Sequence, residues 1–376
     1  MYIIPIFCRI ILTFGALCDN MITKPYENTV QGGILPVMIR KLSRNISVVL
    51  LAAVIFNAFS VYVLSAEPSY SDTPPSETIA HSLVLNGNIG IKFYLNIDDS
   101  IAENGDAYVL ISSQDRKTEK IPVNNDAKKT VTINGEAVEC FVFQYEVAVT
   151  QITSDVILRL CLSDGSTVYT DSYSVYDYAL NILNGSYSDP NKPDELKELM
   201  RAMLNFGGYA QQYFSYSLSE LANENLYDDA QDPVLNNETV IDLSEAYFLK
   251  SPDFPAGLEY LSSALKLDSD TGICFYLRLS DGYTISDYTF TYNSSTLLPI
   301  YDEKLDAYRV TIDGISAPEL AQTRTLLIKD QNKSGYIVYS PLHYVDLVLS
   351  QSSDASLRNT VTALYIYYTA ASRYFS

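Results

Sequence analysis

The hexapeptide Gly-Ile-Lys-Phe-Tyr-Leu at residues 90–95 recurs as Gly-Ile-Cys-Phe-Tyr-Leu at residues 272–277. In the first stretch, Ile91, Phe93 and Leu95 alternate with more polar residues. A period of two is the spacing of a strand that buries one face. The sequence therefore predicts the same half-buried strand at two distant places in the chain.

Two further landmarks repeat in the same order. The pair Tyr-Ser at residues 173–174 returns at residues 339–340, and the pair Tyr-Phe at residues 213–214 returns at residues 374–375. The separation between matching landmarks decreases along the chain, so the loops of the second copy are shorter. Three landmarks in one order predict two tandem copies of a single module.

Each copy is predicted to hold several strands followed by two helices. Asn-Gly at residues 134–135 and Asp-Gly at residues 164–165 are turn sequences between alternating segments. Ser174, with Asp177 three residues later, predicts a helix start, and Pro193 begins the last helix of the first copy. We therefore expect an α+β fold with two tandem copies of a β-rich, sandwich-like module, each ending in a helical hairpin.

The predicted boundaries follow from the landmarks and from composition. They are a leader at 1–66, a linker at 67–82, the first copy at 83–217, a connector at 218–258 and the second copy at 259–376. Within the connector, residues 240–249 are apolar enough to contribute a strand to either copy.

The leader has the pattern of an export signal. A basic cluster of Arg40, Lys41 and Arg44 precedes an apolar run at residues 46–64, and the small pair Ser-Ala follows at residues 65–66. This pattern predicts a secretory signal peptide at about residues 38–66, with Met38 as an alternative start. The alternative is a retained membrane anchor, because an apolar run of this length can just span hydrocarbon.

The charge excludes several classes of partner. The 376 residues carry 25 Lys and Arg against 45 Asp and Glu, a formal net charge of −20. Residues 1–66 hold five basic and two acidic side chains, so the rest has 20 basic and 43 acidic residues and a net charge of −23. Such a charge repels nucleic acids and anionic membrane surfaces. We expect membrane association only through the N-terminal segment, if it is retained.

Three motifs together resemble a known but uncharacterised module. They are the Gly-Ile-x-Phe-Tyr-Leu strand, the helix start Tyr-Ser-Val-x-Asp-Tyr-Ala, and the ending Ala-Met-Leu-Asn-Phe-Gly-x-Tyr-Ala-Gln-x-Tyr-Phe. The module is found in secreted and surface proteins of anaerobic Gram-positive gut bacteria. The resemblance covers residues 83–216 well and residues 261–375 more loosely. It implies a compartment and an architecture, and no activity or catalytic residues.

Candidate catalytic and metal-binding residues are few. The second of the two histidines, His343, falls in a helix start where the first copy has Asp177, which favours a structural position. His81 lies at the edge of the linker. The acidic turn at residues 268–270 suggests calcium, but a plain turn explains both copies, so no metal and no cofactor is predicted. Paired carboxylates for glycoside hydrolysis are not singled out by any spacing.

The cysteines of the exported part are predicted to be inert thiols. They are Cys140, Cys161 and Cys274, an odd number without a disulfide pattern. Cys274 is expected on the outward face of its strand, without a histidine near it in sequence.

Aromatic residues provide the candidate binding site. The chain has 31 Tyr and 14 Phe but no Trp. Tyr94 and Tyr276 take the same outward strand position in the two copies, and Arg278 follows on the same face. A tyrosine offers a flat apolar ring and a hydroxyl, which suit sugar stacking or protein contact. We take Tyr94, Tyr276 and Arg278 as candidate ligand-binding residues. The alternative is that another layer covers this face, and the tyrosines then belong to a core.

These features predict a secreted or cell-surface, non-enzymatic binding or adhesion protein. Its partner would be a glycan, a cell-wall polymer or another surface protein, and two copies would bind with added avidity. The alternatives are a carbohydrate-active hydrolase that uses paired carboxylates, and an envelope spacer without a ligand.

Overall fold

The computed structural model describes residues 76–376, apart from short gaps within them. The gaps are residues 86–87, 104, 115–116, 134, 229, 237–238 and 268–270. The predicted export signal and the acidic turn at residues 268–270 lie outside the described residues. In the described part no helix is both long and apolar enough to cross a membrane.

The protein is a mixed α+β structure with four antiparallel sheets, which confirms the α+β part of the predicted fold. Two sheets belong to residues 76–217, which we call the N-terminal half. One has the order β1 (Ser76–Val84), β2 (Gly90–Ile97), β6 (Glu136–Glu146) and β5 (Lys128–Ile133). The other has the order β4 (Glu119–Pro122), β3 (Tyr108–Ser113), β7 (Val156–Cys161) and β8 (Thr167–Tyr173).

Two further sheets belong to residues 247–376, the C-terminal half. One has the order β10 (Leu258–Lys266), β11 (Gly272–Leu279), β15 (Ala307–Ile312) and β14 (Ile300–Asp302). The other has five strands in the order β13 (Ser295–Leu297), β12 (Thr289–Tyr292), β16 (Arg324–Lys329), β17 (Ser334–Tyr339) and β9 (Phe248–Lys250).

The repeated hexapeptides form β2 and β11, each at the centre of its sheet. Ile91, Phe93 and Leu95 of β2 are fully buried, as the alternation predicts. The two motif glycines allow a neighbouring strand to approach closely. A Cβ at Gly90 would lie 2.6 Å from the carbonyl oxygen of Tyr145, and a Cβ at Gly272 would lie 2.9 Å from that of Ile312. No other residue fits these positions without moving the backbone.

Two pairs of helices follow the strands. The first pair is α4 (Val175–Leu183) with α5 (Pro193–Phe214), and the second is α6 (Pro341–Gln351) with α7 (Ala355–Phe375). Ser174 caps α4 by accepting a hydrogen bond from the amide of Asp177, which confirms the predicted helix start. The remaining helical segments are α3 (Asp99–Ala102) and the 3-10 turns η1 (Val149–Gln151), η2 (Ile285–Asp287) and η3 (Ala317–Glu319).

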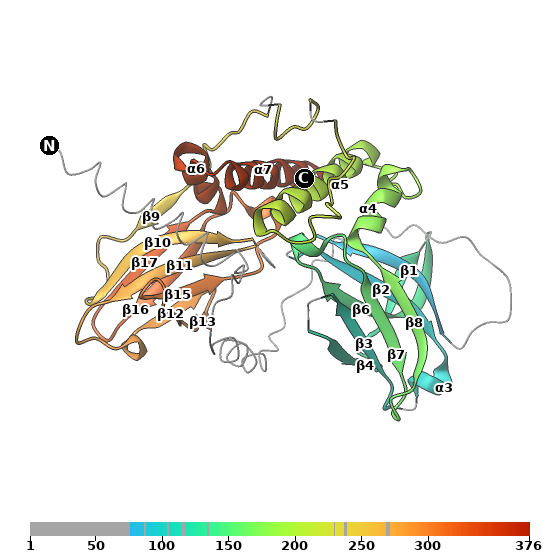
Figure 1. The fold of residues 1–376 in the computed structure, drawn as a ribbon. Coiled ribbons are helices and arrows are strands. Elements are labelled where there is room, and N and C mark those ends of the chain that lie inside the picture. Colours follow the sequence, from blue (N-terminus) through green and yellow to red (C-terminus); the bar gives the residue numbers. More distant parts are fainter. Residues whose placement is uncertain are drawn as a thin grey trace, which may run out of the picture.

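The long helices α5 and α7 pack against each other and connect the two halves (Figure 1). The ring of Phe206 stacks on that of Tyr367 at 6.0 Å between centroids. The Thr360 hydroxyl donates to the carbonyl of Tyr209 at 3.2 Å. One continuous buried cluster includes side chains of all four sheets and of both long helices. The halves are therefore joined by a buried interface as well as by the connector.

The start of the connector packs on α5. Asp232 is buried and accepts hydrogen bonds from the Tyr209 hydroxyl at 2.7 Å and from the Asn205 amide at 3.2 Å. A Cβ at Gly208 would lie 1.9 Å from Asn223 Oδ1, so only glycine allows this approach. These contacts fix the chain as it leaves the N-terminal half.

Two segments outside the predicted copies contribute strands to the sheets. Residues 76–82, which the composition assigns to a linker, form most of β1 and pair with β2. The connector includes the short strand β9, which overlaps the strand considered for residues 240–249, and β9 joins the sheet of the C-terminal half.

Candidate functional site

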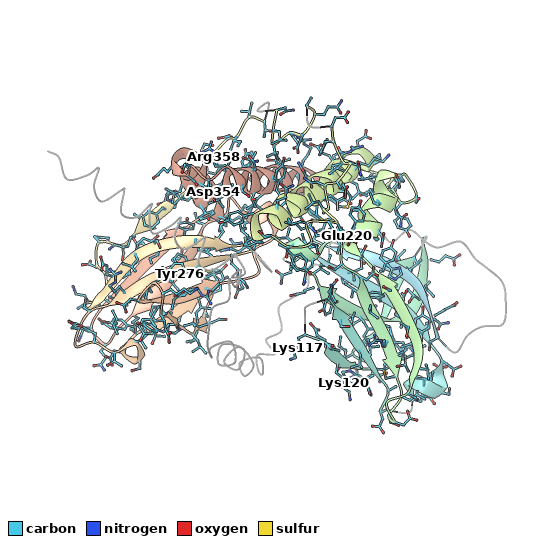
Figure 2. All side chains as sticks on the ribbon, in the orientation of Figure 1. Lys117, Lys120, Glu220, Tyr276, Asp354 and Arg358 are labelled. Carbon is cyan, nitrogen blue, oxygen red and sulfur yellow. The ribbon has the colours of Figure 1, made fainter. Side chains whose placement is uncertain are left out.

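The two tyrosines predicted to face solvent are buried. Tyr94 is 7% exposed, and its hydroxyl lies 2.9 Å from that of Ser82. Tyr276, marked in Figure 2 among the strands of the C-terminal half, is 1% exposed. Burial raises the pKa of Tyr94, although its bond with Ser82 acts in the opposite direction. The expectation of an exposed aromatic strand face is therefore wrong, and the alternative, in which both tyrosines belong to buried clusters, is the one the structure shows. Neither ring can stack directly on a ligand in this conformation.

Arg278 lies nearer the surface but is paired. Its guanidinium lies 3.7 Å from the carboxylate of Glu259, the residue directly opposite on β10. Exposed pairs of this kind contribute little stability. The three residues chosen from the sequence thus form no shared exposed site.

The three described cysteines are buried free thiols. Burial raises the pKa of Cys140 to about 11 and also raises that of Cys274. A thiol with a raised pKa is a poor nucleophile at neutral pH. Cys274 is 3% exposed, so its expected place on an outward solvent face is wrong.

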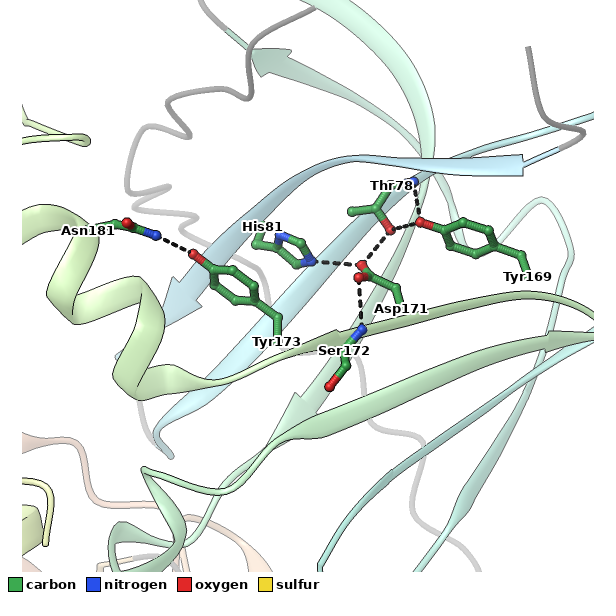
Figure 3. A network of polar contacts seen from close by, with 7 residues as sticks. All are labelled: Thr78, His81, Tyr169, Asp171, Ser172, Tyr173 and Asn181. Atoms are coloured by element: carbon green, nitrogen blue, oxygen red, sulfur yellow. Dashed lines mark hydrogen bonds and ion pairs between the residues drawn. The ribbon is translucent and has the colours of Figure 1, made fainter. Parts of the chain in front are cut away.

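His81 belongs to a polar network between the edge strands β1 and β8 (Figure 3). Its Nε2 lies 2.8 Å from Asp171 Oδ2, and the same oxygen accepts a hydrogen bond from the Thr78 hydroxyl at 2.6 Å. The Tyr169 hydroxyl donates to Thr78 Oγ1 at 3.0 Å and accepts from the Thr78 amide at 2.9 Å. The imidazole also stacks on Tyr173, with 4.0 Å between ring centroids.

The hydrogen bonds of this network join β1 to β8. The Thr78 hydroxyl bonds the carboxylate and not the imidazole, so histidine does not activate it as a nucleophile. The side chains of His81 and Asp171 are 16% and 18% exposed. Burial alone would raise the pKa of Asp171, but hydrogen bonds from His81 and Thr78 outweigh it and lower that pKa. These bonds connect one sheet of the N-terminal half with the other.

His343 has a similar aromatic setting in the C-terminal half. Its ring stacks on Phe248 at 5.5 Å and meets Tyr339 edge-on at 5.3 Å between centroids. Burial lowers the pKa of His343, and the nearby Asp346 opposes this effect. Among the residues that the structure describes, no cluster of three or more His, Cys, Asp or Glu side chains could hold a metal ion.

Most of the exposed large hydrophobic side chains in the described residues belong to residues 247–336. Four of them lie on the five-stranded sheet, and three of these four share one face of it. Leu327 of β16 is 50% exposed, Leu249 of β9 is 40% exposed and Tyr336 of β17 is 36% exposed. These side chains lie on the face opposite Leu326, Ile328 and Ile337, which are fully buried.

The strand register makes these residues neighbours. Leu327 is opposite Tyr336, and Val338, two residues further on, is opposite Leu249. We call this surface the outer sheet face. Its residues are Leu249, Thr289, Thr291, Thr296, Thr325, Leu327, Lys329, Ser334, Tyr336 and Val338.

The outer sheet face carries no carboxylate, in a protein whose net charge is −20. It combines apolar side chains with threonine hydroxyls and one lysine. Sequence reasoning missed it because Leu326, Leu327 and Ile328 are three consecutive apolar residues. Only the register shows that the middle one points away from the core.

One face of the sheet β4-β3-β7-β8 in the N-terminal half is also free of carboxylates. One row across it is Lys120, Leu110, Arg159 and Thr170, and the neighbouring rows hold Tyr108, Pro122, Ser112, Ile157 and Ser172. The Lys120 ammonium lies 3.6 Å from the centroid of the Tyr108 ring. Both halves thus present a sheet face with aromatic, hydroxyl and basic groups.

Comparison with protein-family models, curated proteins and solved structures finds no match for the chain.

Proposed function

We propose that the two halves are tandem copies of one sandwich-like module that ends in a helical hairpin. The strand order β1-β2-β6-β5 corresponds to β10-β11-β15-β14, and β4-β3-β7-β8 corresponds to β13-β12-β16-β17. When the two hexapeptides are aligned, the register shift in β1 between Thr78 and Ala80 coincides with the shift in β10 between Tyr260 and Ser262. At the glycines that start β2 and β11, a Cβ would come too close to a carbonyl oxygen of the neighbouring strand. This shared constraint supports the correspondence.

We further propose that the protein is a secreted or cell-surface, non-enzymatic binding protein. The observation that carries this proposal is the outer sheet face, where Leu249, Leu327 and Tyr336 are exposed side by side without any carboxylate. Contiguous exposed apolar side chains on a folded domain mark interaction surfaces. The basic and apolar pattern at residues 38–66 supports export.

The composition of the face favours a glycan, a cell-wall polymer or a surface protein as partner. An aromatic ring next to hydroxyl groups suits both stacking on a sugar and contact with another protein. The absence of carboxylates on the face removes the local repulsion that the rest of this acidic chain exerts on anionic polymers. The similar face of the N-terminal half would add a second contact and increase avidity.

The test is retention of the purified protein on isolated cell walls and on a polysaccharide panel by affinity electrophoresis. Leu327→Asn and Tyr336→Ala are expected to weaken retention by about fivefold or more each. Leu218→Asn is the matched control, because Leu218 is exposed but belongs to neither sheet face. Equal retention of all variants would contradict the proposed face, and cleavage of a polysaccharide in the gel would contradict a non-enzymatic role.

A further inference from the structure

The strand β8 ends its sheet, and its counterpart β17 does not. Within the described part of the chain, β8 pairs only with β7. In the C-terminal half, β17 pairs with β16 on one side and with β9 on the other. Among the described residues, the position that β9 fills in one half is therefore not filled in the other. An unpaired strand edge is a template on which another strand can add.

The residues that face the core at these two edges differ in kind. When Tyr173 is aligned with Tyr339, Asp171 of β8 corresponds to Ile337 of β17, which is fully buried and lies opposite Lys250 of β9. When the two hexapeptides are aligned, His81 of β1 corresponds to Ser263 of β10. The open edge thus has an inward carboxylate with a histidine partner, where the covered edge has an isoleucine and a serine.

Asp171 also accepts a hydrogen bond from a backbone amide of its own strand. Its Oδ1 accepts a hydrogen bond from the amide of Ser172 at 2.8 Å, while its Oδ2 accepts from Thr78 and His81 (Figure 3). The Ser172 amide is therefore already bonded to the neighbouring carboxylate and does not offer its hydrogen to an added strand. Amides of alternate residues point to the same side of a strand, so the Thr170 amide faces the same open edge.

We propose that Asp171, held by His81 and Thr78, keeps the open edge of β8 from pairing with β8 of a second copy of this chain. An inward charge at an edge strand must remain hydrated or paired, and a strand added over it would bury it further. The partner is a second copy because a two-fold axis relates two identical strand edges antiparallel to each other, so the same edge of two chains can pair with itself. This inference rests on the correspondence between the halves proposed above, and it concerns a different surface from the outer sheet face.

The experiment replaces two residues of the N-terminal half with their counterparts from the C-terminal half. The double variant Asp171→Ile with His81→Ser is expected to form a dimer at micromolar concentration in analytical ultracentrifugation. The wild-type protein is expected to stay monomeric under the same conditions. Circular dichroism checks that the variant is folded, and Asp171→Asn, which removes the charge but keeps the shape, is expected to dimerise more weakly.

Thr170→Pro in the double variant locates the contact. Proline removes the Thr170 amide from the edge, so the dimer is expected to dissociate. A folded double variant that stays monomeric would overturn the proposal, and so would a dimer that survives Thr170→Pro. A wild-type protein that already dimerises through β8 would overturn it as well. Retention on polysaccharides tests the proposed function separately and is measured on the Asp171 and His81 variants, because these two residues lie on neither sheet face; Thr170, which lies on the face of the N-terminal half, is changed only in the dimer experiment.

Discussion

At the scale of single residues, His343 shows how burial determines the charge of a side chain. The imidazole packs between Phe248 and Tyr339, and its pKa is lowered. The unfolded chain therefore binds a proton more readily than the folded protein. The stabilising contribution of the neutral imidazole is complete above the unfolded value of about 6.5, and it is lost as the pH falls from there toward the folded value.

This difference predicts a lower free energy of unfolding at pH 5.5 than at pH 7.5, measured by urea denaturation. His343→Phe keeps the aromatic packing and removes the titrating group, so part of the decrease is expected to disappear. An unchanged pH dependence in His343→Phe would show that other groups cause it.

For Asp171, unlike His343, folding favours the charged form of the side chain, and the effect falls in a lower pH range. Hydrogen bonds lower its pKa in the folded protein, so its contribution is present above the unfolded value of about 3.9 and lost as the pH falls through the folded value. Asp171→Asn is expected to lower the free energy of unfolding at pH 5 by about 1–3 kcal/mol. The difference from wild type should shrink as the pH falls below about 4, and a difference that grows on acidification would contradict this assignment.

At the scale of elements, α5 depends on a glycine where the connector crosses it. Gly208→Ala would place a methyl group against Asn223, whose side chain is held by a hydrogen bond to Asn205. We expect a loss of about 1–3 kcal/mol in the free energy of unfolding from this overpacking. Arg201→Ala, an exposed substitution in the same helix, is the control, and Asn223→Gly added to Gly208→Ala should recover part of the loss. Equal effects of Gly208→Ala and Arg201→Ala would refute the steric explanation.

The strands and helices themselves were largely predictable from the sequence, but the elements that each of them packs against were not. Alternation identified β2 and β11, and the Ser174 cap identified α4, because these depend on residues close in sequence. The strand β1 was assigned to a linker because its polar residues, among them His81, are satisfied by partners on β8, which lies far along the chain. Tyr94 has the alternation of an outward residue, and only the folded chain shows that its ring is covered.

The same limit applies to the candidate site. Leu327 cannot be told from Leu326 and Ile328 by composition, since the register of β16 alone decides which of them is exposed. Asp171 differs, because its inward position could have been inferred from the sequence. An acidic residue in phase with Tyr169 and Tyr173 on a strand was a sign of a special inward position.

At the scale of the whole molecule, α5 and α7 join the two halves through a shared buried core. The buried cluster is continuous across their interface, and Phe206 stacks on Tyr367 within it. We expect wild type to unfold in a single calorimetric transition. Phe206→Ala with Tyr367→Ala is expected to weaken the interface by several kcal/mol and to separate the transition into two. A single, merely shifted transition in the double variant would show that the halves are coupled by other contacts.

The helix interface also has a consequence for how the protein would meet a repetitive surface. Two sheets joined by a loose tether sample many separations, whereas two sheets joined by packed helices keep one spacing and one relative orientation. Under the proposed binding function, such a molecule would therefore favour polymers whose repeating units match its fixed spacing over chemically identical polymers whose units do not.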